Sequence, residues 1–250
     1  MDARLRVEKA LEDAVARATD KSCPPGLAAA VRSAVFPGGA RVRPMLCLAV
    51  SMACGDRNPK ATDAMASAIE FLHCASLVHD DLPCFDDAPI RRGQPSVHCA
   101  FGQPMAVLTG DALIVLAFET LTRALAEKPQ ALPHLLMILS RSVGMAGGLV
   151  AGQAWESESR VPLETYQMAK TGSLFVAAAA AGAASAGADP MRWQDFGARL
   201  GEAYQVADDI RDATSSEADI GKPVGRDEAL CRPNAVQHLG LGGRRITSSR

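Results

Sequence analysis

The stretch LVHDDLPCFDD, residues 77–87, puts a group of carboxylates at the end of a long segment that favours helix. We expect this segment to form one helix with Asp80 and Asp81 at its C-terminal end. That end is the negative pole of the helix dipole, so carboxylates are unfavourable there unless a cation binds them. The proline that follows, Pro83, ends the helix, and the turn lets Asp86 fold back toward the first pair.

A second acidic group, DDIRD at residues 208–212, closes the last segment that favours helix. Asp208 and Asp212 lie one turn apart on one helix face with Asp209 beside them, and like charges at this spacing destabilise a helix by about 0.2–0.5 kcal/mol per pair. A bound divalent cation would make this group of charges stabilising instead of destabilising, and hard carboxylate oxygens suit Mg²⁺. Taken alone, the group could be a solvated helix end. Two such groups favour a magnesium site formed by Asp80, Asp81, Asp86, Asp208, Asp209 and Asp212.

The composition predicts an all-α fold. Alanine is abundant, aromatic residues make up 4%, and alternating β-branched runs are absent, so propensity favours helix over most of the chain. With 250 residues and 48% apolar composition, one domain with a large core is expected. The predicted helices are Arg4–Ala18, Gly26–Phe36, Pro44–Cys54, Pro59–Leu82, Met105–Ala126, Pro133–Glu156, Pro162–Ala186 and Pro190–Asp212.

The overall chemistry excludes several classes of protein. A net charge of −2 gives no electrostatic reason to expect a nucleic-acid partner. Seven scattered cysteines form no C-x-x-C pair and predict neither disulfides nor zinc, which fits a reducing cytoplasm. The N-terminus lacks the apolar core of a signal peptide. The apolar stretches Met105–Leu121 and Ser173–Ala188 are interpreted as buried helices, so no membrane span is expected.

Basic residues accompany the acidic groups. Arg91 and Arg92 follow the first cluster, and the block GGARVRP at residues 38–44 carries Arg41 and Arg43 after a glycine pair. Arginine binds phosphate oxygens through two parallel hydrogen bonds, and glycine allows the backbone to approach closely. These are candidate diphosphate-binding residues; ordinary surface charge is the alternative.

Taken together, these motifs resemble the trans-prenyltransferases, the farnesyl and geranylgeranyl diphosphate synthases. The resemblance runs from about Arg4 to Leu241, and the landmarks occur in the family's order. They are the block at residues 38–44, His73, the run from Asp80 to Gly93, Gly110-Asp111, Gly152-Gln153, Lys170-Thr171-Gly172, Tyr204-Gln205, the group at residues 208–212 and Gly221-Lys222.

The resemblance implies an isoprenoid synthase helical bundle around a central cavity, usually a homodimer, that uses Mg²⁺. Isopentenyl diphosphate and an allylic diphosphate would be the substrates, in isoprenoid and specifically carotenoid biosynthesis. The family's pattern assigns the reacting centre to Lys170, Thr171 and Gln205, and the diphosphate-binding sites to Arg41, Arg43, His73, Arg91, Arg92 and Lys222.

Product length is expected to depend on the residues about one turn before Asp80, which in the family form a floor for the growing tail. Here they are Ala75 and Ser76. Small residues at this floor resemble the geranylgeranyl synthases of bacterial carotenoid pathways and predict a twenty-carbon product. A farnesyl synthase is the alternative, and the two residues could instead serve only close helix packing.

Three features depart from the family. Ala40 stands where the family often has lysine, the family's second downstream lysine has no clear counterpart except Arg232, and a short polar tail, residues 242–250, follows a domain of residues 1–241 where family members continue through further helices. A catalytically impaired or regulatory subunit of the same fold is therefore an alternative. A class I terpene cyclase and a helical metal phosphohydrolase are further alternatives, which product analysis separates.

Overall fold

The computed structural model describes residues 2–159 and 162–214, with side chains as far as Arg211. Eleven α-helices account for most of these residues, joined by short 3₁₀ turns, one π-helical turn at Met168–Gly172 and one two-stranded hairpin. The helices are α1 (Ala3–Ala18), α2 (Pro25–Val35), α3 (Val42–Ala53), α4 (Pro59–Asp80), α5 (Val97–Phe101), α6 (Gln103–Ala124), α7 (Leu132–Val143), α8 (Leu149–Ala154), α9 (Leu163–Gln167), α10 (Ser173–Ser185) and α11 (Met191–Thr214); the strands are β1 (Ile90–Arg91) and β2 (Gln94–Pro95).

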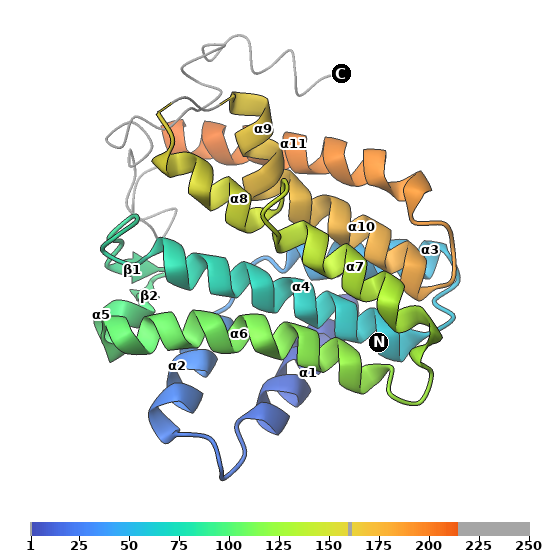
Figure 1. The fold of residues 1–250 in the computed structure, drawn as a ribbon, viewed down its shortest axis with the longest axis horizontal. Helices are drawn as coiled ribbons and strands as arrows, with labels where there is room; N and C mark the ends of the chain where they lie inside the picture. The colour runs from blue at the N-terminus through green and yellow to red at the C-terminus, as the bar shows by residue number, and fades with distance from the viewer. Residues whose placement is uncertain (1, 160–161, 215–250) are drawn as a thin grey trace.

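Helix α4 lies at the centre of the molecule (Figure 1). It contacts α1, α2, α3, α6, α7, α8 and α10, and it is buried around most of its circumference, with Met65, Ile69 and Phe71 fully enclosed. A helix that is apolar on all sides is stable only in the interior of a bundle. The asparagine Asn58 caps its N-terminus by accepting a hydrogen bond from the Ala61 amide. The first acidic cluster therefore lies at the C-terminal end of a helix in the core of the protein.

Helix α6 runs beside α4 (Figure 1) and touches it along its length. By length and composition alone α6 could cross a membrane. Its face with Leu113, Ala117 and Leu121 is buried against the core, but the opposite face is exposed, so the predicted buried helix is buried on one side only. Near the acidic end of α4, the imidazole of His79 occupies the space beside Gly110, since a Cβ there would lie 2.0 Å from His79 Nε2. Gly110 thus lets the two helices approach closely at the first cluster.

Small residues also bring α10 close to its neighbours α3 and α11. A Cβ on Gly182 would lie 2.4 Å from the carbonyl oxygen of Cys47 in α3. A Cβ on Gly201 of α11 would lie 3.0 Å from the Cα of Gly172, and one on Gly197 would lie 2.8 Å from the carbonyl oxygen of Phe175. These glycines therefore allow α10 to pack closely against α3 and against α11, the helix that carries the second cluster.

The all-α single-domain prediction is confirmed, but two predicted helices are interrupted and one hairpin was not predicted. The helix predicted at Pro133–Glu156 is broken at residues 144–148, because this segment contains three glycines, and Gly147 adopts a φ of +84° that a helix excludes. The helix predicted at Pro162–Ala186 divides into α9, the π-helical turn and α10. The hairpin β1–β2 was not expected; its turn places Arg92 and Gly93 at positive φ.

Candidate active site

The first acidic cluster forms where α4 ends. Asp80 and Asp81 are 6% and 2% exposed, and the Asp86 amide donates a 2.8 Å hydrogen bond to the Asp80 carbonyl oxygen. The loop after Pro83 therefore folds back as the sequence predicts. Burial raises the pKa of both buried carboxyl groups, an effect that nearby cations oppose. Anionic groups buried in this way need positive partners.

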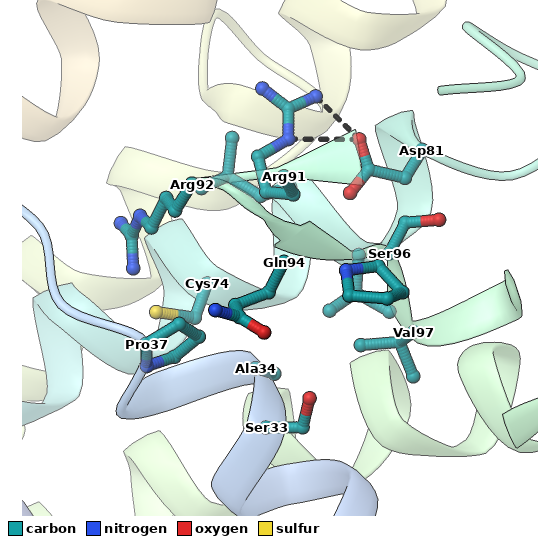
Figure 2. Close-up of a pocket in the computed structure, with 13 residues that line it drawn as sticks. Ser33, Ala34, Pro37, Cys74, Asp81, Arg91, Arg92, Gln94, Ser96 and Val97 are labelled. Carbon is teal, nitrogen blue, oxygen red and sulfur yellow. Dashed lines mark hydrogen bonds and ion pairs between the residues drawn. The ribbon is translucent and has the colours of Figure 1, made fainter. Parts of the chain in front are cut away.

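Each buried aspartate has a cationic partner from another element. Arg91 of β1 donates from Nε to Asp81 Oδ1 at 2.9 Å, and Figure 2 shows the guanidinium facing that carboxylate. Lys170 Nζ lies 3.8 Å from Asp80 Oδ2. Gln153 of α8 donates to Asp80 Oδ1 at 3.0 Å. A basic hairpin, a π-helical turn and a short helix thus converge on the end of α4.

The second cluster lies on α11. Asp209 is 6% exposed and accepts a 2.8 Å hydrogen bond from Gln205 Nε2, one helical turn earlier. Gln205 Oε1 in turn accepts a hydrogen bond from the hydroxyl of Thr171. Asp208 is half-buried. The backbone of Asp212 belongs to α11, but its side chain is outside the described part of the chain.

The π-helical turn Met168–Gly172 connects the two clusters. Lys170 faces Asp80 and also pairs with Glu156, while its neighbour Thr171 reaches Gln205 and through it Asp209. An α-helix turns about 100° per residue, and the wider π turn changes where successive side chains point. The sequence prediction that Lys170, Thr171 and Gln205 share one site agrees with this contact network.

Arg43, Arg92 and His73 form a basic group beside the clusters. Arg43 is 9% exposed, and the Arg92 guanidinium carbon would lie 3.0 Å from a Cβ on Gly39. Arg43 Nε and Arg92 Nη1 are both buried without a hydrogen-bond partner in the described structure. Burial, followed by the charges of the neighbouring arginines, lowers the pKa of His73 well below its usual 6.5. Buried N–H donors without an acceptor suit an anionic ligand.

Arg41 differs from this group. Its side chain donates four hydrogen bonds, at 2.7–3.3 Å, to the carboxylates of Glu8 and Glu70 and to the Val35 carbonyl oxygen, and it is only 2% exposed. Although burial works against its charge, these carboxylates raise the pKa of Arg41. The expectation that Arg41 binds a diphosphate directly is not supported by this arrangement, because all three of its side-chain nitrogens already have acceptors in the protein.

The two residues predicted to limit product length are buried in α4. Ala75 is 2% exposed and belongs to the hydrophobic core. The hydroxyl of Ser76 donates to the His73 carbonyl oxygen at 2.8 Å, and the Ser76 carbonyl oxygen accepts from Gln153 Nε2 at 3.2 Å. Their role in chain length stays a prediction. Lys222, Arg232 and the predicted boundary at residue 241 lie outside the described residues.

Two residues of this region, Glu156 and Arg4, were missed by sequence reasoning. Glu156 accepts hydrogen bonds from Tyr166 Oη, at 2.6 Å, and from Lys170 Nζ; its spacing of three residues from Gln153 was an available signal for a shared helix face. Arg4 of α1 donates to the Gly39 carbonyl oxygen at 3.1 Å. No local pattern pointed to Arg4, because the contact joins segments 35 residues apart.

The donor chemistry of the two clusters suits magnesium. The candidate ligands are carboxylates, and Asp80, Asp81 and Asp209 are buried, so their charges need compensation. Among the described residues, no three acidic, histidine or cysteine side chains form a ready-made metal cage. Mg²⁺ typically takes one or two carboxylates and completes its shell with water and substrate phosphates, so separated carboxylates facing a phosphate site fit this metal.

Comparison with known proteins agrees with this class of helical site. Residues 24–241 match the family model described as polyprenyl synthetase. The chain is 54% identical over 238 residues to geranylgeranyl diphosphate synthase of Cereibacter sphaeroides, covering 95% of this chain and 83% of that protein. It is 51% identical to geranylgeranyl diphosphate synthase of Rhodobacter capsulatus, covering 96% and 83%.

Solved structures show the same fold. A geranyltransferase from Helicobacter pylori, crystallised with magnesium and isoprenyl diphosphate, superposes with a TM-score of 0.81 at 30% identity, covering 100% of this chain and 88% of that chain. A synthase from Zymomonas mobilis gives a TM-score of 0.82 at 31% identity, covering 99% and 88%. The protein is therefore an all-helical prenyltransferase. It belongs to the polyprenyl synthetase family, which confirms the predicted family.

Proposed function

We propose that the protein is a magnesium-dependent geranylgeranyl diphosphate synthase, which adds isopentenyl diphosphate to an allylic diphosphate. The observation that carries the proposal is the contact chain from Asp80 through Lys170 and Thr171 to Gln205 and Asp209. These contacts link a residue of each predicted acidic cluster, which supports one reacting centre between them. Identity above 50% to two proteins named geranylgeranyl diphosphate synthase supports the same activity.

Asp80, Asp81, Asp86, Asp208, Asp209 and Asp212 would hold the magnesium ions. Bound there, magnesium supplies charge neutralisation for the allylic diphosphate and for the negative charge that develops as it leaves. Lys170 and Arg91 already lie against the first cluster. When the diphosphate binds, these two side chains can donate hydrogen bonds to its oxygens instead. Lys222 is proposed to join them.

Departure of diphosphate leaves an allylic carbocation, which the double bond of isopentenyl diphosphate attacks. Thr171 and Gln205 would face this cation with their hydroxyl and carbonyl dipoles. The released diphosphate takes the proton that is lost when the new double bond forms, so no side-chain base is required. The surrounding helices would enclose the central cavity and exclude water, which would quench the cation.

The homoallylic diphosphate is assigned to Arg43, Arg92 and His73. Two of these side chains bury a guanidinium nitrogen without an acceptor among the described residues, and a diphosphate would supply one. Arg41 is assigned a supporting role, since it fixes the loop at residues 38–44 to Glu8 and Glu70. Arg4, on the Gly39 carbonyl, brings another guanidinium to the loop where Ala40 replaces a lysine common in the family.

The product is proposed to have twenty carbons, because the small residues Ala75 and Ser76 stand one turn before Asp80 and the relatives above 50% identity are named geranylgeranyl diphosphate synthases. A cytoplasmic location and a place in carotenoid biosynthesis stay predictions.

An elongation assay tests the proposed function. The purified chain is incubated with Mg²⁺, labelled isopentenyl diphosphate and, in separate reactions, each allylic diphosphate, and the products are separated by length. We expect a twenty-carbon diphosphate that disappears when a chelator is added. A fifteen-carbon end product would favour a farnesyl synthase. Cyclised hydrocarbon, phosphate release without elongation, or turnover only with an added partner chain would each overturn the proposal.

We assign the interface of the proposed homodimer to the outer face of α6. Val107, Leu108 and Val115 expose 43%, 53% and 64% of their surface on this helix, and adjacent exposed aliphatic side chains are typical of a protein interface. A second copy of the chain is the partner that the family resemblance implies. Sedimentation should give a dimer for the wild type and a monomer for Val115→Glu; a monomeric wild type would contradict this assignment.

A further inference from the structure

The guanidinium of Arg43 is held by aromatic rings. Its central carbon lies 4.8 Å from the ring centroid of Phe175 in α10 and 5.7 Å from that of Tyr204 in α11. The two rings are 5.1 Å apart between centroids and tilted by 43°. Arg43 is thereby attached to two helices that are far from it in sequence, and both distances are within the range of a cation–π contact.

Aromatic rings attract a guanidinium without accepting its N–H groups as a carboxylate does, so a cation–π contact keeps these donors for an added anion. Among the described residues, Arg43 has no carboxylate at ion-pair distance, although the charges of Glu70 and Asp208 act on it, and its Nε is buried there without an acceptor. Arg41, two residues earlier, is the opposite case, with its N–H groups bonded to Glu8 and Glu70. Of the two arginines, only Arg43 is arranged to bind an added anion.

Close packing of α11 against α10 positions Tyr204 beside Arg43. Gly201, one turn earlier on the same face, lies so close to α10 that a Cβ would be 3.0 Å from Gly172 Cα and 3.2 Å from Phe175 Cβ. This close approach puts the Tyr204 ring against Phe175. The next residue is Gln205, which bonds to Asp209, so the ring joins the second cluster's helix to Arg43.

We propose that Phe175 and Tyr204 are positioning residues, which hold the Arg43 guanidinium beside their two rings so that its N–H groups can bind the diphosphate of isopentenyl diphosphate. That the ligand is isopentenyl diphosphate follows from the proposed function, on which this inference rests. Without the tyrosine ring, the long arginine side chain must be ordered when the ligand binds, and ordering one such side chain weakens binding by about three- to tenfold.

Binding measurements on matched variants test the inference. Isopentenyl diphosphate is titrated into wild type, Tyr204→Leu, Tyr204→Phe and Phe196→Leu by calorimetry, and KM values for both substrates are measured in parallel. Phe196→Leu is the control: it removes an aromatic partner of Trp193 from the same helix. We expect Tyr204→Leu to raise the Kd and KM for isopentenyl diphosphate about three- to tenfold, with the allylic KM within about twofold. Tyr204→Phe and Phe196→Leu should match the wild type.

A background without the guanidinium separates positioning from general destabilisation. In Arg43→Met, adding Tyr204→Leu should change the Kd no further, since there is no guanidinium left to position. An equal Kd in Tyr204→Leu and wild type, an equally weak Tyr204→Phe, or the same loss in the Arg43→Met background would overturn the inference. Because binding is measured apart from turnover, a wild type that binds the ligand but does not elongate it would overturn only the proposed function.

Discussion

Lys170 and Thr171 are consecutive residues whose side chains point to different acidic clusters. Lys170 Nζ lies 3.8 Å from Asp80 Oδ2, and the Thr171 hydroxyl donates to Gln205, which holds Asp209. Both residues belong to the π-helical turn Met168–Gly172. The local irregularity is therefore part of the site, as π turns often are.

Removing the Thr171 hydroxyl should disconnect Gln205 from the reacting centre. We expect Thr171→Val to lower kcat by about 10- to 100-fold, since a preorganised dipole is lost where charge develops. Thr171→Ser should keep most of the activity. Ser173→Ala is the control, because the Ser173 hydroxyl bonds only to the Ala169 carbonyl oxygen among the described residues. Wild-type kcat in Thr171→Val would contradict this role.

Arg41 and Arg43 should respond differently to the same substitution. Arg41→Met leaves the buried Glu70 without its closest partner, so the free energy of unfolding should fall by about 3–5 kcal/mol. Arg43→Met should change stability less but raise the KM for isopentenyl diphosphate by about 10- to 100-fold, the effect of losing a charge-assisted contact. Denaturant unfolding and steady-state kinetics on both variants provide the measurement. A reversed pattern would show that the two roles are misassigned.

Enlarging Ala75 should shorten the product. We expect Ala75→Tyr to release mainly a fifteen-carbon diphosphate, because the ring would occupy the proposed path of the tail. Ala75 is buried, so overpacking should also cost about 1–3 kcal/mol of stability. Ala75→Ser serves as the control of similar size. Product length is measured by chromatography. An unchanged twenty-carbon product from a folded Ala75→Tyr would show that Ala75 does not limit the length of the product.

His73 should make the stability of the protein depend on pH. Burial and the surrounding arginines lower its pKa well below 6.5, so the folded protein keeps His73 neutral while the unfolded chain takes up a proton near that pH. As the pH falls below about 6.5, wild type should lose stability relative to His73→Gln, by at most about 1.4 kcal/mol per pH unit. Unfolding curves at several pH values, with the exposed His134→Gln as control, measure this. Parallel losses in wild type and His73→Gln would contradict it.

Much of the fold and site was predictable from local chemistry. Asp80, Asp81 and Asp209 stand in segments whose helical character and charge are visible in the sequence, and the family's landmarks linked them. What could not be predicted depends on contacts between distant segments. Arg41 and Arg43 look alike in the sequence, and only the positions of Glu8, Glu70, Phe175 and Tyr204 separate a structural arginine from one with available donors.

Both acidic clusters are proposed to belong to one metal site. The most direct measurement is anomalous diffraction from crystals grown with Mn²⁺ and inorganic diphosphate. We expect metal ions within about 2.0–2.3 Å of carboxylate oxygens from both the Asp80 group and the Asp208 group, bridged by diphosphate. Metal at one cluster only, or diphosphate bound with Asp80 and Asp81 still paired to Lys170 and Arg91, would contradict it.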